Sequence, residues 1–214
     1  MTREKTYSTL WLTIFFAVFI WSVIKPHDYF TWFLEVFPAM IAFVILVSTY
    51  RAFRFTHLVY WLILAHAVIL MIGGHYTYAE VPLFTWLKDI FNLSRNNYDK
   101  VGHLAQGFVP AMVAREILIR KSPLKPGKWL FFIVVCICLA ISALYELIEW
   151  WVAVNTGEAA ESFLGTQGDI WDSQSDMFLA LIGAVSALVL LGKHHNALLV
   201  KFIGSQNTEK QTKK

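Results

Sequence analysis

Seven of the chain's fifteen carboxylates lie within residues 145–176, where one apolar segment ends and the next begins. A carboxylate in an apolar segment is costly, so Glu146 and Glu149 are candidates for function by default. Glu158 and Glu161 lie between the segments, where we expect them to be solvated. The seven are Glu146, Glu149, Glu158, Glu161, Asp169, Asp172 and Asp176.

Helical spacing predicts three sets of polar side chains that each share one helix face. Asp99, His103 and Gln106 are spaced i, i+4, i+7, so they lie on one face of a helix. His75 follows an apolar segment and is expected at the same end of the molecule. Two further sets have the same kind of spacing: Glu146 with Glu149, and Asp169 with Asp172 and Asp176.

Converging carboxylates and imidazoles can perform two kinds of chemistry. Oxygen ligands, supplemented by a histidine, can hold a divalent metal ion. Coupled acids and histidines can instead exchange protons. We expect acid–base catalysis from Glu146, Glu149, His103 and Asp99, and metal ligation from Asp172, Asp176, Asp169 and His75.

Each candidate also has a purely structural interpretation. Asp169, Asp172 and Asp99 are placed where an acid can cap the start of a helix. The histidines can form hydrogen bonds between helices, since polar side chains bridge helices in lipid. Glu146 and Glu149 can pair with Lys100 or Arg95. Near the basic C-terminal end, His194 and His195 are expected to contact anionic headgroups rather than a metal.

Composition identifies a membrane protein. The chain is 57% hydrophobic and 16% aromatic, and its mean hydropathy is +0.53. Ordinary soluble domains are about 45–50% apolar. The net charge of +3 and the lack of a clustered basic face argue against nucleic-acid binding. Cys136 and Cys138, spaced i, i+2 in an apolar run, predict neither a disulfide nor a metal site.

The apolar segments predict an all-α bundle of six transmembrane helices, because each is near the length that crosses a bilayer and no alternating strand pattern occurs. A short interfacial helix is expected at Leu83–Phe91. Residues 1–204 form one transmembrane domain, and residues 205–214 a polar, disordered cytoplasmic tail. The predicted spans are Leu10–Ile24, Trp32–Tyr50 (with Glu35 near its start), Thr56–Gly74, Asp99–Ile119, Trp129–Val154 and Asp176–Leu191.

The distribution of basic residues predicts the orientation. With the N-terminus in the cytoplasm, the inner side holds fourteen Lys and Arg residues and the outer side four. Basic residues favour the cytoplasmic side, so both termini are expected there. The candidate acids and histidines then gather on the outer side.

Four motifs resemble the YjdF-type bacterial inner-membrane proteins. The resemblance covers about residues 8–195 and implies a multi-pass protein of the bacterial inner membrane, but no activity. The opening Asp99-Lys100-xx-His103 also resembles, over a shorter stretch, VanZ-like proteins linked with glycopeptide resistance. The motifs are Gly73-Gly74-His75-Tyr76-Thr77-Tyr78, Asn97-Tyr98-Asp99-Lys100-Val101-Gly102-His103, Tyr145-Glu146-xx-Glu149-Trp150 and Gly168-Asp169-xx-Asp172-xxx-Asp176-Met177.

Three functions fit these observations. The first is a metal-assisted enzyme that acts at the outer leaflet on a lipid headgroup or a lipid-linked envelope intermediate. The second is a small transporter in which the acids relay protons or bind a cation. The third is a structural or regulatory membrane protein. The expected partners are membrane lipid and a lipid-linked or small-molecule substrate, with no nucleic acid.

Overall fold

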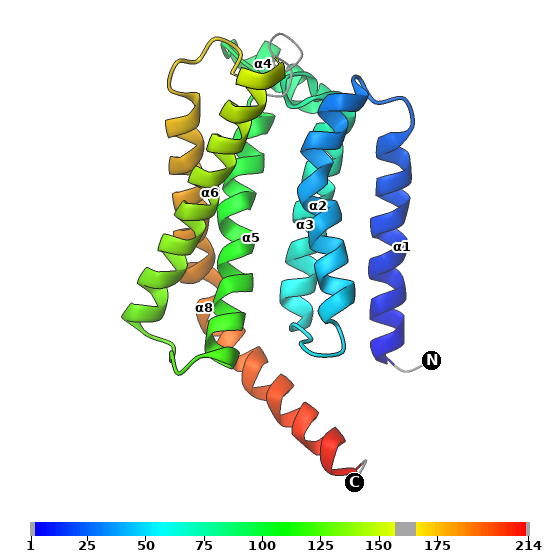
Figure 1. Cartoon of the computed structure of the whole chain (residues 1–214), viewed down its shortest axis with the longest axis vertical. Helices are drawn as coiled ribbons and strands as arrows, with labels where there is room; N and C mark the ends of the chain where they lie inside the picture. Colours follow the sequence, from blue (N-terminus) through cyan, green and yellow to red (C-terminus); the bar gives the residue numbers. More distant parts are fainter. Residues whose placement is uncertain (1–2, 157–165, 213–214) are drawn as a thin grey trace.

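The computed structural model describes residues 3–156 and 166–212, which form helices and connecting loops (Figure 1). No strand occurs within those ranges, so the all-α prediction is confirmed. The elements are α1 (Arg3–Val23), α2 (Tyr29–Thr49), α3 (His57–Tyr76), the 3-10 helix η1 (Tyr78–Glu80), α4 (Pro82–Phe91), α5 (Tyr98–Lys121), α6 (Lys128–Thr156) and α8 (Asp172–Thr212). Glu158 and Glu161 lie outside the described residues.

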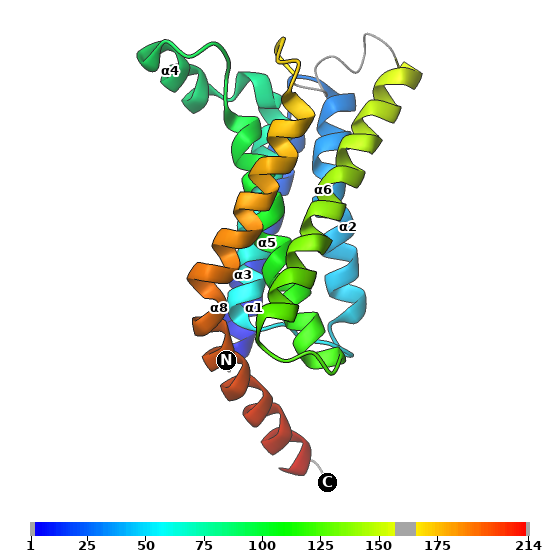
Figure 2. The ribbon, with the colours of Figure 1, turned by 90° about the vertical axis from the view of Figure 1, so that its left-hand side faces the viewer.

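Five of these helices, namely α1, α2, α3, α6 and α8, are long and apolar enough to cross a membrane. The sequence predicted six crossings, and the sixth depends on α5. This helix is the most polar of the long ones, yet it packs against α3, α6 and α8 (Figure 2). Neighbouring helices therefore shield its polar side chains, which include the buried Arg115 and Glu116.

Helices α5 and α8 approach each other unusually closely because glycine occupies both sides of the contact. A Cβ atom at Gly107 would lie 1.8 Å from the backbone oxygen of Ala180. A Cβ atom at Gly183 would lie 2.1 Å from the backbone oxygen of Leu104. Small residues allow helix backbones to pack this closely in membranes.

The same interface carries the ionisable side chains. Each helix presents small residues in the middle of the contact and acidic or imidazole groups near one end. Because the ridges at every fourth residue face each other, close packing of the small residues brings the polar groups together. The ridges are Asp99, His103, Gly107 and Ala111 on α5, and Asp172, Asp176, Ala180 and Ala184 on α8.

A second polar cluster lies toward the other end of this interface. Glu116 accepts hydrogen bonds from the Thr56 backbone N–H and hydroxyl, and it pairs with Arg120 at 2.7 Å. His195 Nε2 lies 2.9 Å from Glu116 Oε2, and its Nδ1 lies 2.7 Å from Arg115. His195 is fully buried, so its predicted contact with headgroups is wrong, while His194 is exposed.

Two peripheral predictions have different outcomes. The short helix expected at Leu83–Phe91 is present as α4, and its apolar Leu83, Trp86 and Ile90 are exposed on a projecting helix (Figure 2). Its place at the membrane surface stays a prediction. The disordered tail expected after about Gly204 is wrong, because α8 continues as a helix to Thr212.

Replacing Gly183 with alanine tests the close contact. We expect Gly183→Ala to lower the stability of the detergent-solubilised protein by about 1–3 kcal/mol, because the added methyl group forces the backbones apart. Gly192→Ala is the matched control on the same helix, since a Cβ there meets nothing within 4 Å. Thermal unfolding measures both variants, and equal effects would contradict the role of the α5–α8 contact.

Candidate functional site

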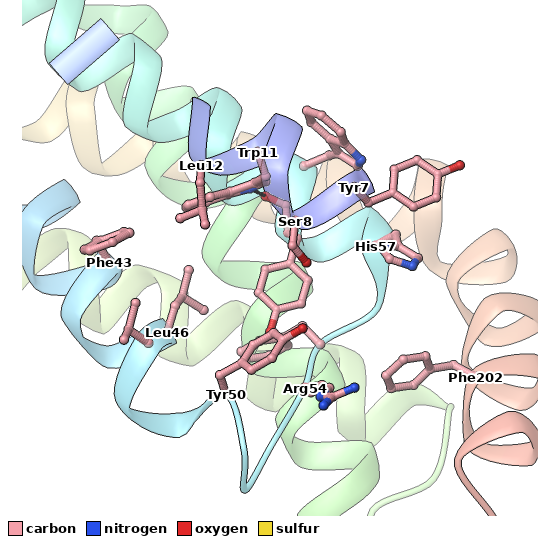
Figure 3. A pocket seen from close by; sticks show the side chains of 14 residues that line it. Tyr7, Ser8, Trp11, Leu12, Phe43, Leu46, Tyr50, Arg54, His57 and Phe202 are labelled. Atoms are coloured by element: carbon pink, nitrogen blue, oxygen red, sulfur yellow. Dashed lines mark hydrogen bonds between the residues drawn. The ribbon is translucent and has the colours of Figure 1, made fainter. Parts of the chain in front are cut away.

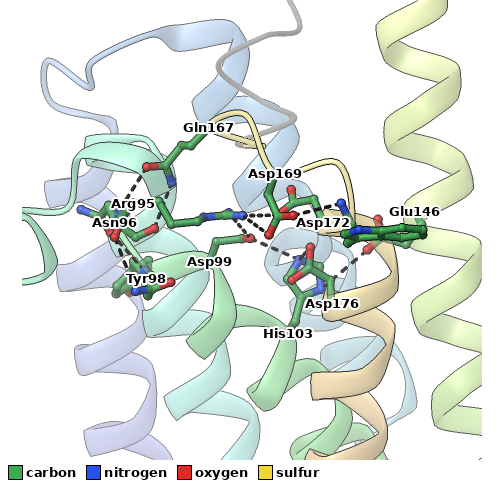
Figure 4. A network of polar contacts seen from close by, with 12 residues as sticks. Arg95, Asn96, Tyr98, Asp99, His103, Glu146, Gln167, Asp169, Asp172 and Asp176 are labelled. Atoms are coloured by element: carbon green, nitrogen blue, oxygen red, sulfur yellow. Dashed lines mark hydrogen bonds and ion pairs between the residues drawn. The ribbon is translucent and has the colours of Figure 1, made fainter. Parts of the chain in front are cut away.

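The site lies where α5, α6 and α8 meet, at the end of the bundle that carries α4 (Figures 1 and 4). Asp99 and His103 come from the first two turns of α5, Glu146 from α6, and Asp176 from α8. All four side chains are largely buried. Three sequence segments separated by more than 25 residues therefore contribute to one cluster.

Three of these residues have the geometry of a metal site. His103 Nε2 lies 3.2 Å from Asp99 Oδ1 and 3.8 Å from Asp176 Oδ2. One ligand atom from each of Asp99, His103 and Asp176 can be chosen so that all three lie within 4.8 Å of one another. Two carboxylates and an imidazole, with coordination positions left open, suit a divalent cation such as Zn²⁺ or Mn²⁺.

Gln106 orients the His103 ring. Its Oε1 lies 2.9 Å from His103 Nδ1, and with the amide oxygen as acceptor this contact favours the tautomer that carries a proton on Nδ1. Nε2 then faces two carboxylates with either a second proton or a lone pair. A lone pair on Nε2 would repel the two carboxylates unless a cation lay between them. A proton and a metal ion therefore compete for the same position beside Nε2.

Two buried carboxylate oxygens beside His103 have no hydrogen-bond partner among the described residues. They are Asp176 Oδ1 and Glu146 Oε1, and the latter lies 3.8 Å from His103 Nδ1. A buried polar atom without a partner is costly and calls for an explanation such as an ion or a ligand. These oxygens are where a cation, a proton or a polar substrate group would be stabilised.

Arg95 is the main cation of the site and precedes α5. It donates a hydrogen bond to Asp172 and lies 3.3 Å from Asp99 and 3.4 Å from Asp169 (Figure 4). Burial lowers the pKa of Arg95, but its hydrogen bond to Asp172 and the nearby carboxylates outweigh that effect and raise it. Arg95 therefore stays charged and holds the starts of α5 and α8 together.

Two loops are joined beside Arg95 by reciprocal hydrogen bonds. The Asn96 backbone N–H donates to Gln167 Oε1 at 3.0 Å, and Gln167 Nε2 donates to the Asn96 carbonyl at 2.9 Å. The Asn96 side chain also donates to the Val81 carbonyl and to Thr85, which fixes α4 to the same loop. This clamp sets the position of Arg95 between the two helices.

The cluster has more acids than bases. Five carboxylates, those of Asp99, Glu146, Asp169, Asp172 and Asp176, lie beside two basic groups, Arg95 and His103. Uncompensated charge in a low-dielectric interior costs several kcal/mol or more. Protons or a bound cation must therefore balance the excess, which is the condition for either predicted chemistry.

A cavity of about 370 Å³ begins at Asp99 and His103 and continues between α2, α3, α5 and α6. Pockets of about 300–1,000 Å³ are typical for small-molecule ligands. Its polar end also includes Glu35, Glu149 and Tyr145, whereas most of its length is lined by aliphatic side chains. Tyr78 packs its ring against Gly73 and Gly102 at this polar end.

The structure brings together most of the predicted site residues, but not all. Asp99, His103, Glu146 and Asp176 form the cluster, Asp172 joins it through Arg95, and Glu149 lines the cavity. Asp169 is a peripheral member, because its Oδ1 accepts from the Trp171 backbone N–H and its Oδ2 faces Arg95.

His75 is not part of the cluster, so the expectation that it shares a metal site with Asp172 and Asp176 is wrong. Its Nδ1 lies 3.1 Å from the Ser22 carbonyl at the end of α1, and its ring packs on Trp21 at 4.3 Å. The His75 carbonyl accepts from the His27 backbone N–H. His75 therefore ties α3 to the α1–α2 loop.

Sequence reasoning left two residues out of the site. Arg95 was considered only as a partner for Glu146 or Glu149, and its pairing with Asp172 depends on loop geometry that periodicity does not predict. Glu35 is a buried carboxylate in an apolar helix. Like Glu146, Glu35 is a carboxylate in an apolar segment, so its sequence context alone marks it as a candidate.

Comparison with known proteins places the chain in a family. The model of a family described as "Predicted membrane protein (DUF2238)" matches residues 7–197. The chain belongs to this family. It is 50% identical over 195 residues to the protein named "Inner membrane protein YjdF" of Escherichia coli (strain K12), covering 91% of this chain and 92% of that one. No solved structure matches it.

Membership of the DUF2238 family confirms the YjdF-type resemblance and identifies a multi-pass membrane protein. The similarity to VanZ-like proteins stays a prediction. The family description states no reaction or ligand.

Arg95 and Asp172 should be energetically coupled. We expect Arg95→Gln to destabilise the protein by about 3–5 kcal/mol, because it leaves buried carboxylates without their cation. Asp172→Asn in the same chain should recover part of this loss, with a coupling energy of about 0.5–3 kcal/mol. Thermal unfolding of both single variants and the double variant measures it, with Lys88→Gln on α4 as the control. Strictly additive effects would contradict the ion pair.

Proposed function

We propose that this protein is an inner-membrane enzyme that uses a divalent metal ion to act on the polar headgroup of a lipid or lipid-linked envelope intermediate. The observation that carries the proposal is the position of the Asp99, His103 and Asp176 cluster. It lies at the polar end of a cavity whose remaining length is apolar. A headgroup and its hydrocarbon chain have this same polarity.

Each residue then has a role that follows from its contacts. Asp99, His103 and Asp176 would hold the ion, which polarises a phosphoryl oxygen and lowers the pKa of bound water. Glu146, with an unpartnered oxygen near His103, is placed to accept or donate a proton. Arg95 is a positioning residue, because it holds Asp99 and Asp172 together.

The route to the site supports a lipid substrate. The cavity is bounded by α2 on one side and α6 on the other, and Ile45 and Ile141, which line it from these two helices, are exposed. In a bilayer an exposed apolar side chain of a crossing helix meets hydrocarbon. A lipid chain can therefore enter between α2 and α6 without crossing water.

The topology that we propose has six crossings, with α5 as the sixth, and both termini in the cytoplasm. Two observations support this topology. Helix α5 runs the length of the bundle beside α8, and the N-terminal end of α1 and the C-terminal end of α8 both lie at the end of the bundle opposite α4 (Figure 1). The surplus of basic residues at that end agrees with a cytoplasmic location.

Alkaline phosphatase fusions test this topology. We expect a fusion after Asn92 to be active, because the loop after α4 faces the periplasm, and a fusion after Lys125 to be inactive. If α5 does not cross the membrane, both fusions will have the same activity. Equal expression levels, checked by immunoblot, make the comparison valid.

The proposed metal site makes a direct prediction. The detergent-purified protein, stripped with a chelator and then incubated with Zn²⁺ or Mn²⁺, should retain the ion on elemental analysis. His103→Gln or Asp176→Asn should reduce its affinity roughly tenfold or more, and acidification should release it because protons compete for the ligands. His75→Gln is the control that should retain it, and retention by all variants would contradict the site.

Catalysis is tested on the same metal-loaded protein. Vesicles of inner-membrane lipid extract are incubated with it, and mass spectrometry follows the headgroups. We expect a metal-dependent product that Glu146→Gln reduces and Glu80→Gln does not, since Glu80 is exposed and pairs with His27 outside the site. If no product forms, whichever metal ion the protein retains, an enzymatic role is contradicted.

One observation favours the second candidate, a proton- or cation-coupled transporter. Leu46 and Phe55 line the cavity described above and also a second cavity that begins at the opposite end of α2. The two cavities have only these side chains in common among the described residues, and together they extend along the bundle from the acidic cluster to Arg54 and His57. Proton flux into vesicles that Asp176→Asn abolishes, without any lipid product, would favour this candidate over the enzyme.

A further inference from the structure

A second cavity of about 370 Å³ lies at the end of the bundle opposite the acidic cluster (Figure 3). Helices α1, α2 and α3, the loop between α2 and α3, and Phe202 of α8 surround it. It touches the first cavity at Leu46 and Phe55 and shares no ionisable residue with it. A ligand in this cavity would therefore not contact the residues of the proposed reaction.

The walls of this cavity are aromatic and aliphatic along most of their length. Trp11, Leu12 and Phe43 form its inner part between α1 and α2. Trp11 is fixed there because its indole N–H donates to the Tyr60 carbonyl at 2.8 Å. The result is a rigid apolar groove on helices that we propose to cross the membrane.

Two basic side chains stand at the outer edge of the groove. The Arg54 guanidinium lies 4.8 Å from the centre of the Tyr50 ring, and the His57 ring lies 4.9 Å from the Tyr7 ring. Both Arg54 and His57 are exposed. The contact with the Tyr50 ring holds the Arg54 guanidinium in place while the side chain stays exposed, so it is able to meet an anion.

The charge around this edge is strongly positive. Arg51, Lys121 and Lys201 lie at the same end, and each is exposed. The nearby Glu116 is buried and already bonded to Thr56, Arg120 and His195. Among the described residues, the Arg54 guanidinium contacts an aromatic ring rather than a carboxylate, so its charge complements an external anion.

We propose that this cavity binds an anionic phospholipid of the leaflet that faces the two termini. The phosphate lies against Arg54 and His57, and an acyl chain lies in the groove formed by Trp11, Leu12 and Phe43. A lipid fits better than a peptide, because Leu12 and Val47 line the groove and are exposed where the proposed topology places the bilayer, while the Arg54 charge stands at its edge. This binding is independent of the proposed reaction at the other end.

Native mass spectrometry of the full chain tests the proposal with phosphatidylglycerol and phosphatidylcholine of identical acyl chains. We expect preferential retention of phosphatidylglycerol, and Arg54→Gln to reduce that preference about fivefold. Arg51→Gln is the matched control, since Arg51 is exposed on the same loop but does not line the cavity. Thermal unfolding confirms that both variants are folded.

Filling the groove provides a second, independent measurement. Leu12→Trp should reduce retention of both lipids, because the indole occupies the space of the acyl chain, whereas Leu10→Trp, outside the cavity, should have no effect. Equal loss in Arg54→Gln and Arg51→Gln would mean that only diffuse surface charge attracts the lipid. That result, or unchanged retention in Arg54→Gln, would overturn the proposal.

Discussion

The close contact between α5 and α8 is the constraint on which the rest of the structure depends. Gly107 and Gly183 let the two backbones meet where any side chain would collide. Only at this distance do Asp99 and His103 on one helix reach Asp176 on the other. The contact also keeps α5, the most polar of the long helices, in the interior of the bundle. The site therefore forms only when the small residues of α5 and α8 pack against each other.

The two polar clusters on this interface differ in a way that separates structure from function. At the end near the termini, both Glu116 oxygens are bonded, by Thr56, Arg120 and His195. At the α4 end, oxygens of Glu146 and Asp176 are buried without hydrogen-bond partners among the described residues. The first cluster is complete as it stands, and the second is completed by a proton, a cation or a substrate.

Hydrophobic periodicity predicts which side chains share a face of one helix, but it does not predict the position of a side chain that a loop determines. The shared face of Asp99 and His103 followed from i, i+4 spacing, and the apolar segments predicted the helices to within a few residues at most ends. Arg95 acts through the clamp between Asn96 and Gln167, which joins residues 71 apart in the sequence. His75 was misplaced because it lies at the end of α3, where packing on Trp21 outweighs proximity to the acids.

Helix α2 lines the cavity but lies outside the group of helices that carries the acidic cluster. This helix packs chiefly against α3, whereas α5, α6 and α8 contact one another. The cavity lies between these two groups, and α2 contributes both its carboxylate, Glu35, and exposed apolar residues such as Ile45. A small separation of α2 from α6 would widen the lateral entrance without disturbing the α5–α8 contact. The fold thus combines the close α5–α8 contact, which brings Asp99, His103 and Asp176 together, with a helix, α2, that lines the cavity from outside that contact.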